Sequence, residues 1–493
     1  MPAQLPIDAF PAWAHVNNVC FQNVILKEVG DEKGVGLLAE SQFKSVSKQS
    51  SSEKTSVLLQ VPHDLVLSAE AVDGYAKVDG NFKQLLEVAG GLSTRHDMML
   101  YLISHLTQTR RPGGLTPTPW TKYIRFLPRP VPVPTMWTEP ERILLHGTSL
   151  ETALKAKFIR LADEFGQLRE KSMGLAFWNA LFWKDETVSL EDWILADAWY
   201  RSRCLELPRS GTSMVPGLDM VNHSGLPAAY YDENTKDEVL LAVRPGTSLA
   251  AGEEVTISYG DAKPASEMLF SYGFIDSANA VYKLSLPLDP LPDDPLAKAK
   301  LHVFGESPLV TLSLATEEGK GGEPGLATWY SPFVYLMCLN EEDGLSFQLL
   351  QDVSGGRELR LLWQDADVTD RVHDFENLIR GHPLCKVFEL RAVSALHQTV
   401  EEQLVRADRG PSDAELEALQ QAGVLRSERV AAAQTLKEVE RKVMASAVRT
   451  LERERDFLLA NHDVIAYLGS VENPPVGQAP QGTILSEHED DFS

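Results

Sequence analysis

Residues 217–224 carry the side chains best suited to orient a small polar ligand. Their sequence, Gly-Leu-Asp-Met-Val-Asn-His-Ser, places the amide of Asn222 beside the imidazole of His223, and both groups can donate and accept hydrogen bonds. Upstream, Gly34-Val-Gly36 supplies two glycines, which allow a backbone to lie close to a ligand. Alone, the first pattern is typical of a turn with a core histidine, and the second of a hairpin turn. Together they indicate a ligand site.

Two Tyr-Gly pairs follow at Tyr259 and Tyr272, thirteen residues apart, after a Gly252-Glu-Glu254 segment. A phenol has an ordinary pKa of about 10, so at neutral pH it is not a free base. An orienting or electrostatic role suits it better. Either tyrosine alone could be a half-buried strand residue. The turn, the Gly-Glu-Glu segment and both Tyr-Gly pairs in this order are far more specific than any one of them.

Length and composition limit the classes of protein. With 493 residues, the chain exceeds one compact core, so two or three domains are expected. The net charge of −24 disfavours direct binding of nucleic acid, which needs a basic face. It suits a basic protein partner, or solubility alone. The four cysteines form no CxxC pair, so neither a disulfide framework nor a metal site is expected.

Hydropathy favours a protein that does not enter membranes. No run of about 18 apolar residues is present, so no span is expected. The first ten residues lack the basic and apolar regions of a signal peptide. We therefore expect a protein of the cytoplasm, the nucleus or both. We also expect it to be a monomer.

The elements that must position these residues alternate in type. Apolar and β-branched runs predict strands at residues 24–28, 34–39, 57–62, 239–246 and 255–259. Between them, apolar residues at three- and four-residue spacing predict helices, as at residues 98–106 and 150–168. Four tryptophans in this helical block are expected in its core because tryptophan buries much apolar area; they are Trp178, Trp183, Trp193 and Trp199.

The second half of the chain begins at a boundary rich in proline and aspartate, residues 286–295. Beyond it the pattern is mainly helical, and residues 415–459 predict one or two long surface helices. Residues 45–54 predict a mobile, serine-rich loop, and the acidic C-terminal residues a disordered tail. The motifs with chemistry all precede residue 280, so we expect the later helices to recognise a partner.

The motifs between Gly34 and Ile275, in this order, resemble the SET-domain protein lysine methyltransferases. The class in question includes the Rubisco large-subunit methyltransferase and fungal ribosomal-protein lysine methyltransferases. The stretches Tyr123-Ile-Arg-Phe-Leu-Pro128 and His146-Gly-Thr148 are also similar to the class. The resemblance implies an α+β fold: a split SET-domain β-fold with a helical insert, followed by an all-α substrate-binding domain. The implied divisions are residues 15–80 and 201–280 for the SET domain, 81–200 for the insert, 296–470 for the substrate-binding domain and 471–493 for the tail.

The resemblance also implies the chemistry. The protein is expected to be an S-adenosyl-L-methionine-dependent protein-lysine N-methyltransferase, acting on a basic non-histone protein such as a ribosomal protein or translation factor. Lysine has an ordinary pKa of about 10.4, so the site must accept a neutral amine or lower its pKa. Because methyl transfer is an in-line displacement, the enzyme contributes mainly alignment in a dry channel.

The residues implied for each role follow from the matched motifs. Tyr259 corresponds to the methyl-transfer tyrosine, and Tyr272 and Phe274 to the aromatic wall around cofactor and lysine channel. Asn222 and His223 are expected to orient the carboxylate and adenine of the cofactor. The cofactor-binding set is Lys33, Gly34, Val35, Ser202, Asp219, Asn222, His223, Tyr272 and Phe274. Arg203, beside Ser202, could instead pair with Glu206.

Two departures from the class leave the shape of the lysine channel undetermined. Cys204 stands where an aromatic residue is common, and Asn279 lacks the acidic residue that often follows it. The number of methyl groups transferred therefore stays open. A histidine acceptor is one alternative, although Tyr272 beside Gly273 favours lysine. A non-catalytic SET scaffold that binds a partner protein is another, and the presence of Asn222, His223 and Tyr259 argues against it.

Overall fold

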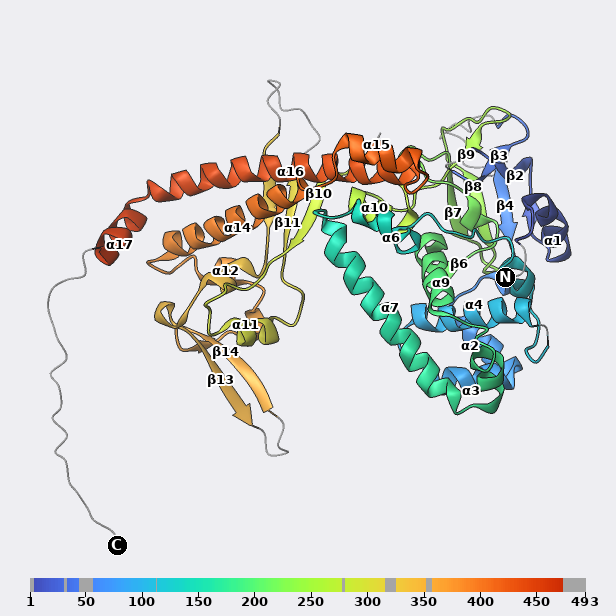
Figure 1. Ribbon diagram of the computed structural model, residues 1–493, viewed down its shortest axis with the longest axis horizontal. Coiled ribbons are helices and arrows are strands. Elements are labelled where there is room, and N and C mark those ends of the chain that lie inside the picture. The colour runs from blue at the N-terminus through green and yellow to red at the C-terminus, as the bar shows by residue number, and fades with distance from the viewer. Residues whose placement is uncertain are drawn as a thin grey trace, which may run out of the picture. The chain divides into compact units, whose positions relative to one another are not determined.

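The computed structural model describes residues 4–30, 33–43, 56–111, 113–276, 280–314, 325–351 and 357–472. The predicted loop at residues 45–54, Asn279 and the tail from residue 473 lie outside the described residues. The chain divides into two compact units (Figure 1). Unit 1 comprises Met1–Leu284, Leu314–Glu318 and Gln403–Val443, and unit 2 comprises Ser285–Ser313, Gly319–Glu402 and Met444–Ser493.

The sheets of unit 1 join strands from before and after the helical insert. One antiparallel sheet has the order β1 (Cys20–Phe21), β4 (Val57–Val61), β8 (Val239–Val243), β7 (Ala229–Glu233). Another has the order β2 (Val24–Glu28), β3 (Val35–Ala39), β9 (Glu254–Val255). A hairpin of β5 (Cys204–Leu207) and β6 (Gly211–Met214) completes them. Since β4 pairs with β8 and β3 with β9, the split β-fold expected from the sequence is confirmed (Figure 1).

The insert packs as a block of helices with a buried centre. Its helices are α2 (Ala69–Val78), α3 (Gly80–Ala89), α4 (Thr94–Arg110), α5 (Pro119–Tyr123), α6 (Glu139–Ile143), α7 (Ser149–Met173), α8 (Ala176–Trp178) and α9 (Leu190–Arg203). The first of them, α2, begins at Ala69, before the expected residue 81. Its start is fixed by the Ser68 side chain, which accepts a hydrogen bond from the Ala71 N–H and so caps the helix. Apolar residues occur all round α4, as in a helix with no solvent face. The four tryptophans of this block are buried, as predicted.

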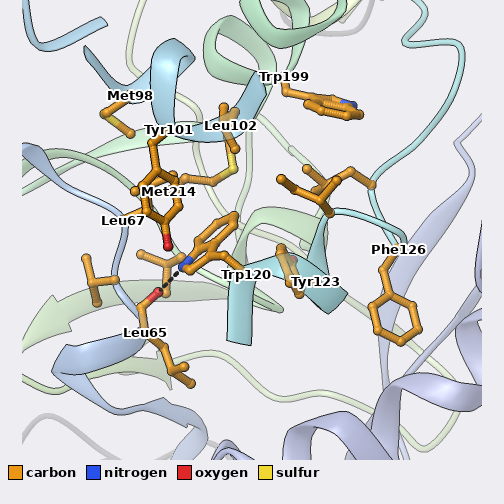
Figure 2. Close-up of a cluster of buried hydrophobic side chains, with 14 of the residues drawn as sticks. Leu65, Leu67, Met98, Tyr101, Leu102, Trp120, Tyr123, Phe126, Trp199 and Met214 are labelled. Carbon is orange, nitrogen blue, oxygen red and sulfur yellow. Dashed lines mark hydrogen bonds between the residues drawn. The ribbon is translucent and has the colours of Figure 1, made fainter. Parts of the chain in front are cut away.

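Insert and sheets share one hydrophobic core. Figure 2 shows Trp120 between residues of the β-fold and of α4, and its Nε1 donates to the Leu65 carbonyl at 3.0 Å. Tyr101 and Tyr123 from the insert and Met214 from β6 belong to the same cluster. The insert is therefore part of the body that positions the SET segments.

Unit 1 also takes its core from the C-terminal half of the chain. Helix α15 (Asp413–Gln421) and the first part of α16 (Ser427–Leu459) pack there, and the predicted long helices at 415–459 are confirmed. Arg426 forms an ion pair with Glu141 at 2.6 Å, and the Glu141 side chain is 1% exposed. Burial alone would raise the pKa of Glu141, but the hydrogen bonds from Arg426 outweigh it and lower the pKa to about 2. The core side chains contributed are Leu416, Leu425, Val430, Ala433, Leu436 and Val439.

The compact units therefore differ from the divisions drawn from the sequence, which assigned residues 296–470 to a separate domain. Unit 2 begins at Ser285, and α16 passes from one unit to the other at Val443. A helical pattern predicts that a segment is a helix, but not which neighbours each turn of it contacts.

Unit 2 contains helices, chiefly α11 (Ala297–Phe304), α12 (Val334–Cys338), most of α14 (Cys385–Ala407) and α17 (His462–Glu472). It is not all-α as expected, because it also contains strands. They are β10 (Lys283–Pro287, from Ser285 on), β11 (Leu309–Leu314), β12 (Ala327–Tyr330), β13 (Leu345–Gln351), β14 (Arg357–Trp363) and β15 (Ala366–Asp367). Strands β13 and β14 pair antiparallel from Leu345↔Trp363 to Gln351↔Arg357. The Gly355-Gly356 pair between two short apolar runs was the available signal for this hairpin.

Across the described ranges, no helix is long and apolar enough to cross a membrane.

Candidate active site

The site is organised by two segments of unit 1 that lie side by side. Ile257 N–H donates to the Asn222 carbonyl, and Ser224 N–H donates to the Ile257 carbonyl, both at 3.0 Å. His223 and Ile257 thus form a parallel bridge. The strand predicted at residues 255–259 is shorter, because β9 ends at Val255 and only this bridge continues it. The bridge brings the Asn-His-Ser turn next to Tyr259.

Tyr259 is bonded to that turn at both of its ends. Its backbone N–H donates to His223 Nδ1 at 3.1 Å, and its hydroxyl donates to the Val221 carbonyl at 2.8 Å. Burial raises the pKa of Tyr259 above its ordinary value, so the phenol is neutral at physiological pH. Since its proton is directed to Val221, the hydroxyl oxygen offers lone pairs to any further partner. The group can therefore accept a hydrogen bond, but it cannot serve as a base.

His223 is held as a neutral imidazole with a defined tautomer. Burial lowers the pKa of His223, outweighing the carboxylate of Asp276, whose oxygen lies 3.8 Å from His223 Nε2. Because Nδ1 accepts the Tyr259 N–H, the ring proton of the neutral form resides on Nε2. The ring thus presents an N–H donor on its Nε2 edge.

The aromatic residues predicted for the site form one cluster. Ring centroids lie 4.7 Å apart for Tyr259 and Tyr272, 5.3 Å for His223 and Tyr259, and 6.1 Å for His223 and Phe274. Phe274 follows α10 (Ala265–Tyr272) through Gly273, which has φ +86° and would place a Cβ 2.6 Å from backbone of Pro132. Although it belongs to the cluster, Phe274 is 37% exposed. Its apolar ring is available to a planar ligand.

Two other predicted residues lie near Asn222: Val35 bonds to it directly, and Lys33 is linked to it through Glu254. Asn222 Nδ2 donates to the Val35 carbonyl at 3.3 Å and to Glu254 Oε1 at 2.8 Å. Lys33 Nζ pairs with Glu254 Oε2 at 3.0 Å. Gly34, with φ +67°, makes the β2–β3 turn that brings Lys33 and Val35 to this place. Glu254 was not predicted as a site residue; its signal was the Gly-Glu-Glu segment.

A cavity of about 590 Å³ opens beside the aromatic cluster. Tyr259 and Tyr272 line it together with Ser202 and Asp219. The residues around Glu254 do not line it, and neither do His223 and Phe274. Tyr259 therefore belongs both to the ligand-orienting turn, through its hydrogen bonds, and to the cavity, through its side chain. The volume of the cavity is in the range of sites that bind small molecules or side chains.

Ser202 and Asp219 lie with this cavity and not with Asn222 and His223. The Ser202 hydroxyl donates to the Ala198 carbonyl of its own helix α9 at 2.7 Å. The Asp219 carboxylate accepts from the Tyr123 hydroxyl, and from the Gly217 N–H at 3.0 Å. Burial raises the pKa of Asp219 although Arg203 opposes this. The geometry gives neither residue a direct place beside the ligand-orienting turn.

Two neighbouring residues take different partners from those considered for them. Arg203 donates to the Asp219 carbonyl at 2.7 Å, rather than pairing with Glu206. Tyr123, noted in the sequence only as part of a motif, is fully buried and anchors Asp219. Cys204 lines the cavity as a thiol, because burial raises its pKa well above the ordinary value.

Comparison with known proteins identifies similar sequences and similar solved structures. No protein-family model matches the chain. "SET domain-containing protein 8" of Schizosaccharomyces pombe is 27% identical over 380 residues, which cover 76% of this chain and 80% of that protein. The chloroplastic Rubisco large subunit N-methyltransferase of Pisum sativum is 25% identical over 307 residues, 60% of this chain and 57% of that one.

Solved structures show the same fold. The crystal structure of the SET domain of LSMT bound to lysine and AdoHcy matches with a TM-score of 0.61 at 21% identity, covering 96% of this chain and 99% of that chain. The structure of Rubisco LSMT bound to AdoMet matches with a TM-score of 0.62 at 20% identity, covering 96% and 98%. The expected SET fold, split by a helical insert and followed by a region containing long helices, is thus confirmed. The chain has the fold of the LSMT SET domain and is similar in sequence to both SET domain-containing protein 8 and the Rubisco large subunit N-methyltransferase.

Proposed function

We propose that the protein is an S-adenosylmethionine-dependent protein-lysine N-methyltransferase. The observation that carries this proposal is the position of Tyr259, which is bonded to the Asn-His-Ser turn at both ends and also lines the cavity. A cofactor at the turn and an acceptor side chain in the cavity would meet at this hydroxyl. The relatives support it, since the Pisum sativum protein is named an N-methyltransferase and the LSMT structure holds lysine and AdoHcy.

The residues around Asn222 fit the amino-acid end of such a cofactor. Both Nδ2 hydrogens of Asn222 are taken, by Val35 and Glu254, and both partners can only accept. Within the described residues nothing donates to Asn222 Oδ1, so this oxygen is the atom offered to a ligand. It suits the cationic amino group of that end, whereas the resemblance in sequence implied the cofactor carboxylate for Asn222 or His223. The exposed ring of Phe274 and the Nε2–H of His223 suit the adenine.

When bound, S-adenosylmethionine supplies a methyl group on a sulfonium, and this chain's residues align the acceptor. The Tyr259 oxygen can accept an N–H of a neutral amine and so direct its lone pair. A lysine that enters the cavity leaves water, and this burial lowers its pKa. Departure of one proton before transfer is thereby favoured.

The proposed target is a basic, non-histone protein in the cytoplasm or nucleus, such as a ribosomal protein or translation factor. The net charge of −24 supports a basic partner, since opposite charges accelerate association. The test is incubation of the protein with labelled S-adenosylmethionine and lysate from cells that lack it, with mass spectrometry to locate the label. Label on a lysine of a basic protein is expected. Label on histidine would support the alternative acceptor, and cofactor binding without any label would support a non-catalytic scaffold.

Removal of either side chain of the turn should weaken cofactor binding. Asn222→Ala leaves the Glu254 carboxylate without this donor, and His223→Ala removes the acceptor of the Tyr259 N–H. We expect a loss of about 1–3 kcal/mol for each, measured by calorimetry with S-adenosylmethionine.

Asn234→Ala is a matched control for these two variants. Asn234 lies between β7 and β8, and its amide bonds to Glu238 at 2.7 Å instead of to a residue of the Asn-His-Ser turn. Its cofactor affinity should equal that of the wild type. Wild-type affinity in the Asn222 and His223 variants as well would assign the turn a purely structural role.

A further inference from the structure

Glu254 occupies a central place in the ligand-orienting part of the site. Its two carboxylate oxygens have different partners, with Asn222 Nδ2 at 2.8 Å from Oε1 and Lys33 Nζ at 3.0 Å from Oε2. The Glu254 side chain is 18% exposed, against 61% for Lys33. Glu254 therefore connects the β2–β3 turn to the Asn-His-Ser turn, which lie far apart in the sequence.

The backbone is shaped to let this carboxylate approach. A Cβ on Gly36 would lie 2.7 Å from Glu254 Oε1 and 2.9 Å from Asn222 Nδ2, closer than real Cβ contacts allow. At Gly34 a Cβ would meet nothing within 4 Å, so glycine is needed there for its φ of +67° and not for space. The two glycines of the motif thus have separate tasks. Gly36 provides the space in which β3, Asn222 and Glu254 meet.

We infer that Glu254 is a positioning residue that fixes the side-chain amide of Asn222 for the amino-acid end of the cofactor. A carboxylate can only accept, so it holds Asn222 with Nδ2 inward and Oδ1 toward the ligand. A second acceptor, the Val35 carbonyl, reinforces the same orientation. The inference rests on the proposed function, because it concerns how the same site recognises the amino-acid end of its cofactor.

Substitution by glutamine separates orientation from size. The side chain of Glu254→Gln has nearly the same shape, but its amide can donate as well as accept. It can therefore bond Asn222 in either amide orientation, and the preference for Oδ1 toward the ligand is weakened because only the Val35 carbonyl still enforces it. The cost should appear only for ligands that carry the amino-acid moiety.

The experiment measures affinity by calorimetry for S-adenosylmethionine and for 5′-methylthioadenosine, which lacks the amino-acid moiety. Glu254→Gln should bind S-adenosylmethionine roughly tenfold more weakly, as for one charged hydrogen bond, and 5′-methylthioadenosine as the wild type does. Glu253→Gln is the matched control, because Glu253 accepts from the Ala250 N–H at 2.8 Å in the adjacent turn. It should bind both ligands normally.

A second variant approaches the same contact from the other side. Gly36→Ala should push the Glu254 carboxylate away from Asn222 and give the same selective loss, with folding checked by circular dichroism.

Three outcomes would count against the inference. Unchanged affinity for S-adenosylmethionine in folded Glu254→Gln and Gly36→Ala would overturn it while leaving the proposed function intact. Equal losses for both ligands would also overturn it, since they would show a general structural role. Failure of the wild type to bind S-adenosylmethionine would remove the proposed function and the inference together.

Discussion

Tyr259→Phe should reduce methyl transfer by about 10²–10³-fold while S-adenosylmethionine binding stays within a few-fold. The hydroxyl is the only group lost. It carries the bond to the Val221 carbonyl and the lone pairs offered to the acceptor amine. The ring would keep its place beside His223 and Tyr272, with centroids at 5.3 Å and 4.7 Å in the native protein. Single-turnover transfer of labelled methyl and calorimetry of cofactor binding measure the two effects separately.

Tyr75→Phe is a matched control for this change. Like Tyr259, Tyr75 is buried and donates its hydroxyl to a backbone carbonyl, that of Thr116 at 2.8 Å, but it lies in α2 of the insert. It should lower stability by about 1 kcal/mol without changing the rate of transfer by a folded enzyme. Unchanged turnover in Tyr259→Phe would remove that hydroxyl from the mechanism. An equal loss of cofactor affinity would place its role in binding rather than in transfer.

The local parts of the site could be predicted from the sequence because their residues are close along the chain. Asn222 and His223 are adjacent, and the strands at Val24–Glu28 and Val57–Val61 follow apolar runs. Glu254 could not be assigned a role in this way. Its partners Lys33 and Asn222 are far from it in sequence. The pairing of β3 with β9 brings Lys33 to Glu254, and the bridge between His223 and Ile257 brings Asn222.

The sequence pattern also could not predict which hydrogen-bond partners the polar side chains of the site have. A serine near the end of a helix can bond to a ligand or to its own backbone, and Ser202 bonds to Ala198. The Asn222 amide can present either end, and its protein partners decide which. The hairpin β13–β14 was missed for another reason: a short strand lies within a region whose overall composition indicates helix.

Ending the chain after Pro295 should destabilise the part that remains, rather than yield a folded catalytic fragment. The cut removes α15 and the start of α16, whose side chains complete a core with Trp137, Leu145 and Leu269. Each buried leucine or valine contributes about 1.5–3 kcal/mol, and the cut also removes Arg426, the ion-pair partner of Glu141. A typical total stability of about 5–15 kcal/mol does not cover several such losses. Circular dichroism and thermal melting should show an unfolded or aggregated fragment.

Single substitutions test the same core without removing a segment. Leu436→Ala, at a fully buried position of α16, should lower the unfolding free energy by about 2–5 kcal/mol. Leu419→Ala, on α15 but 37% exposed, should change it by about 0.5 kcal/mol or less. Both are read from the melting temperature, and cofactor affinity is measured in the same samples.

A fragment ending at Pro295 with a native spectrum and native affinity for S-adenosylmethionine would show that these helices are dispensable. In that case target recognition could be assigned to the removed region by comparing methylation of an intact protein with cofactor binding. If the fragment unfolds as expected, the segment Gln403–Val443 belongs to the catalytic body, and target recognition must be studied by surface substitutions in the full-length chain.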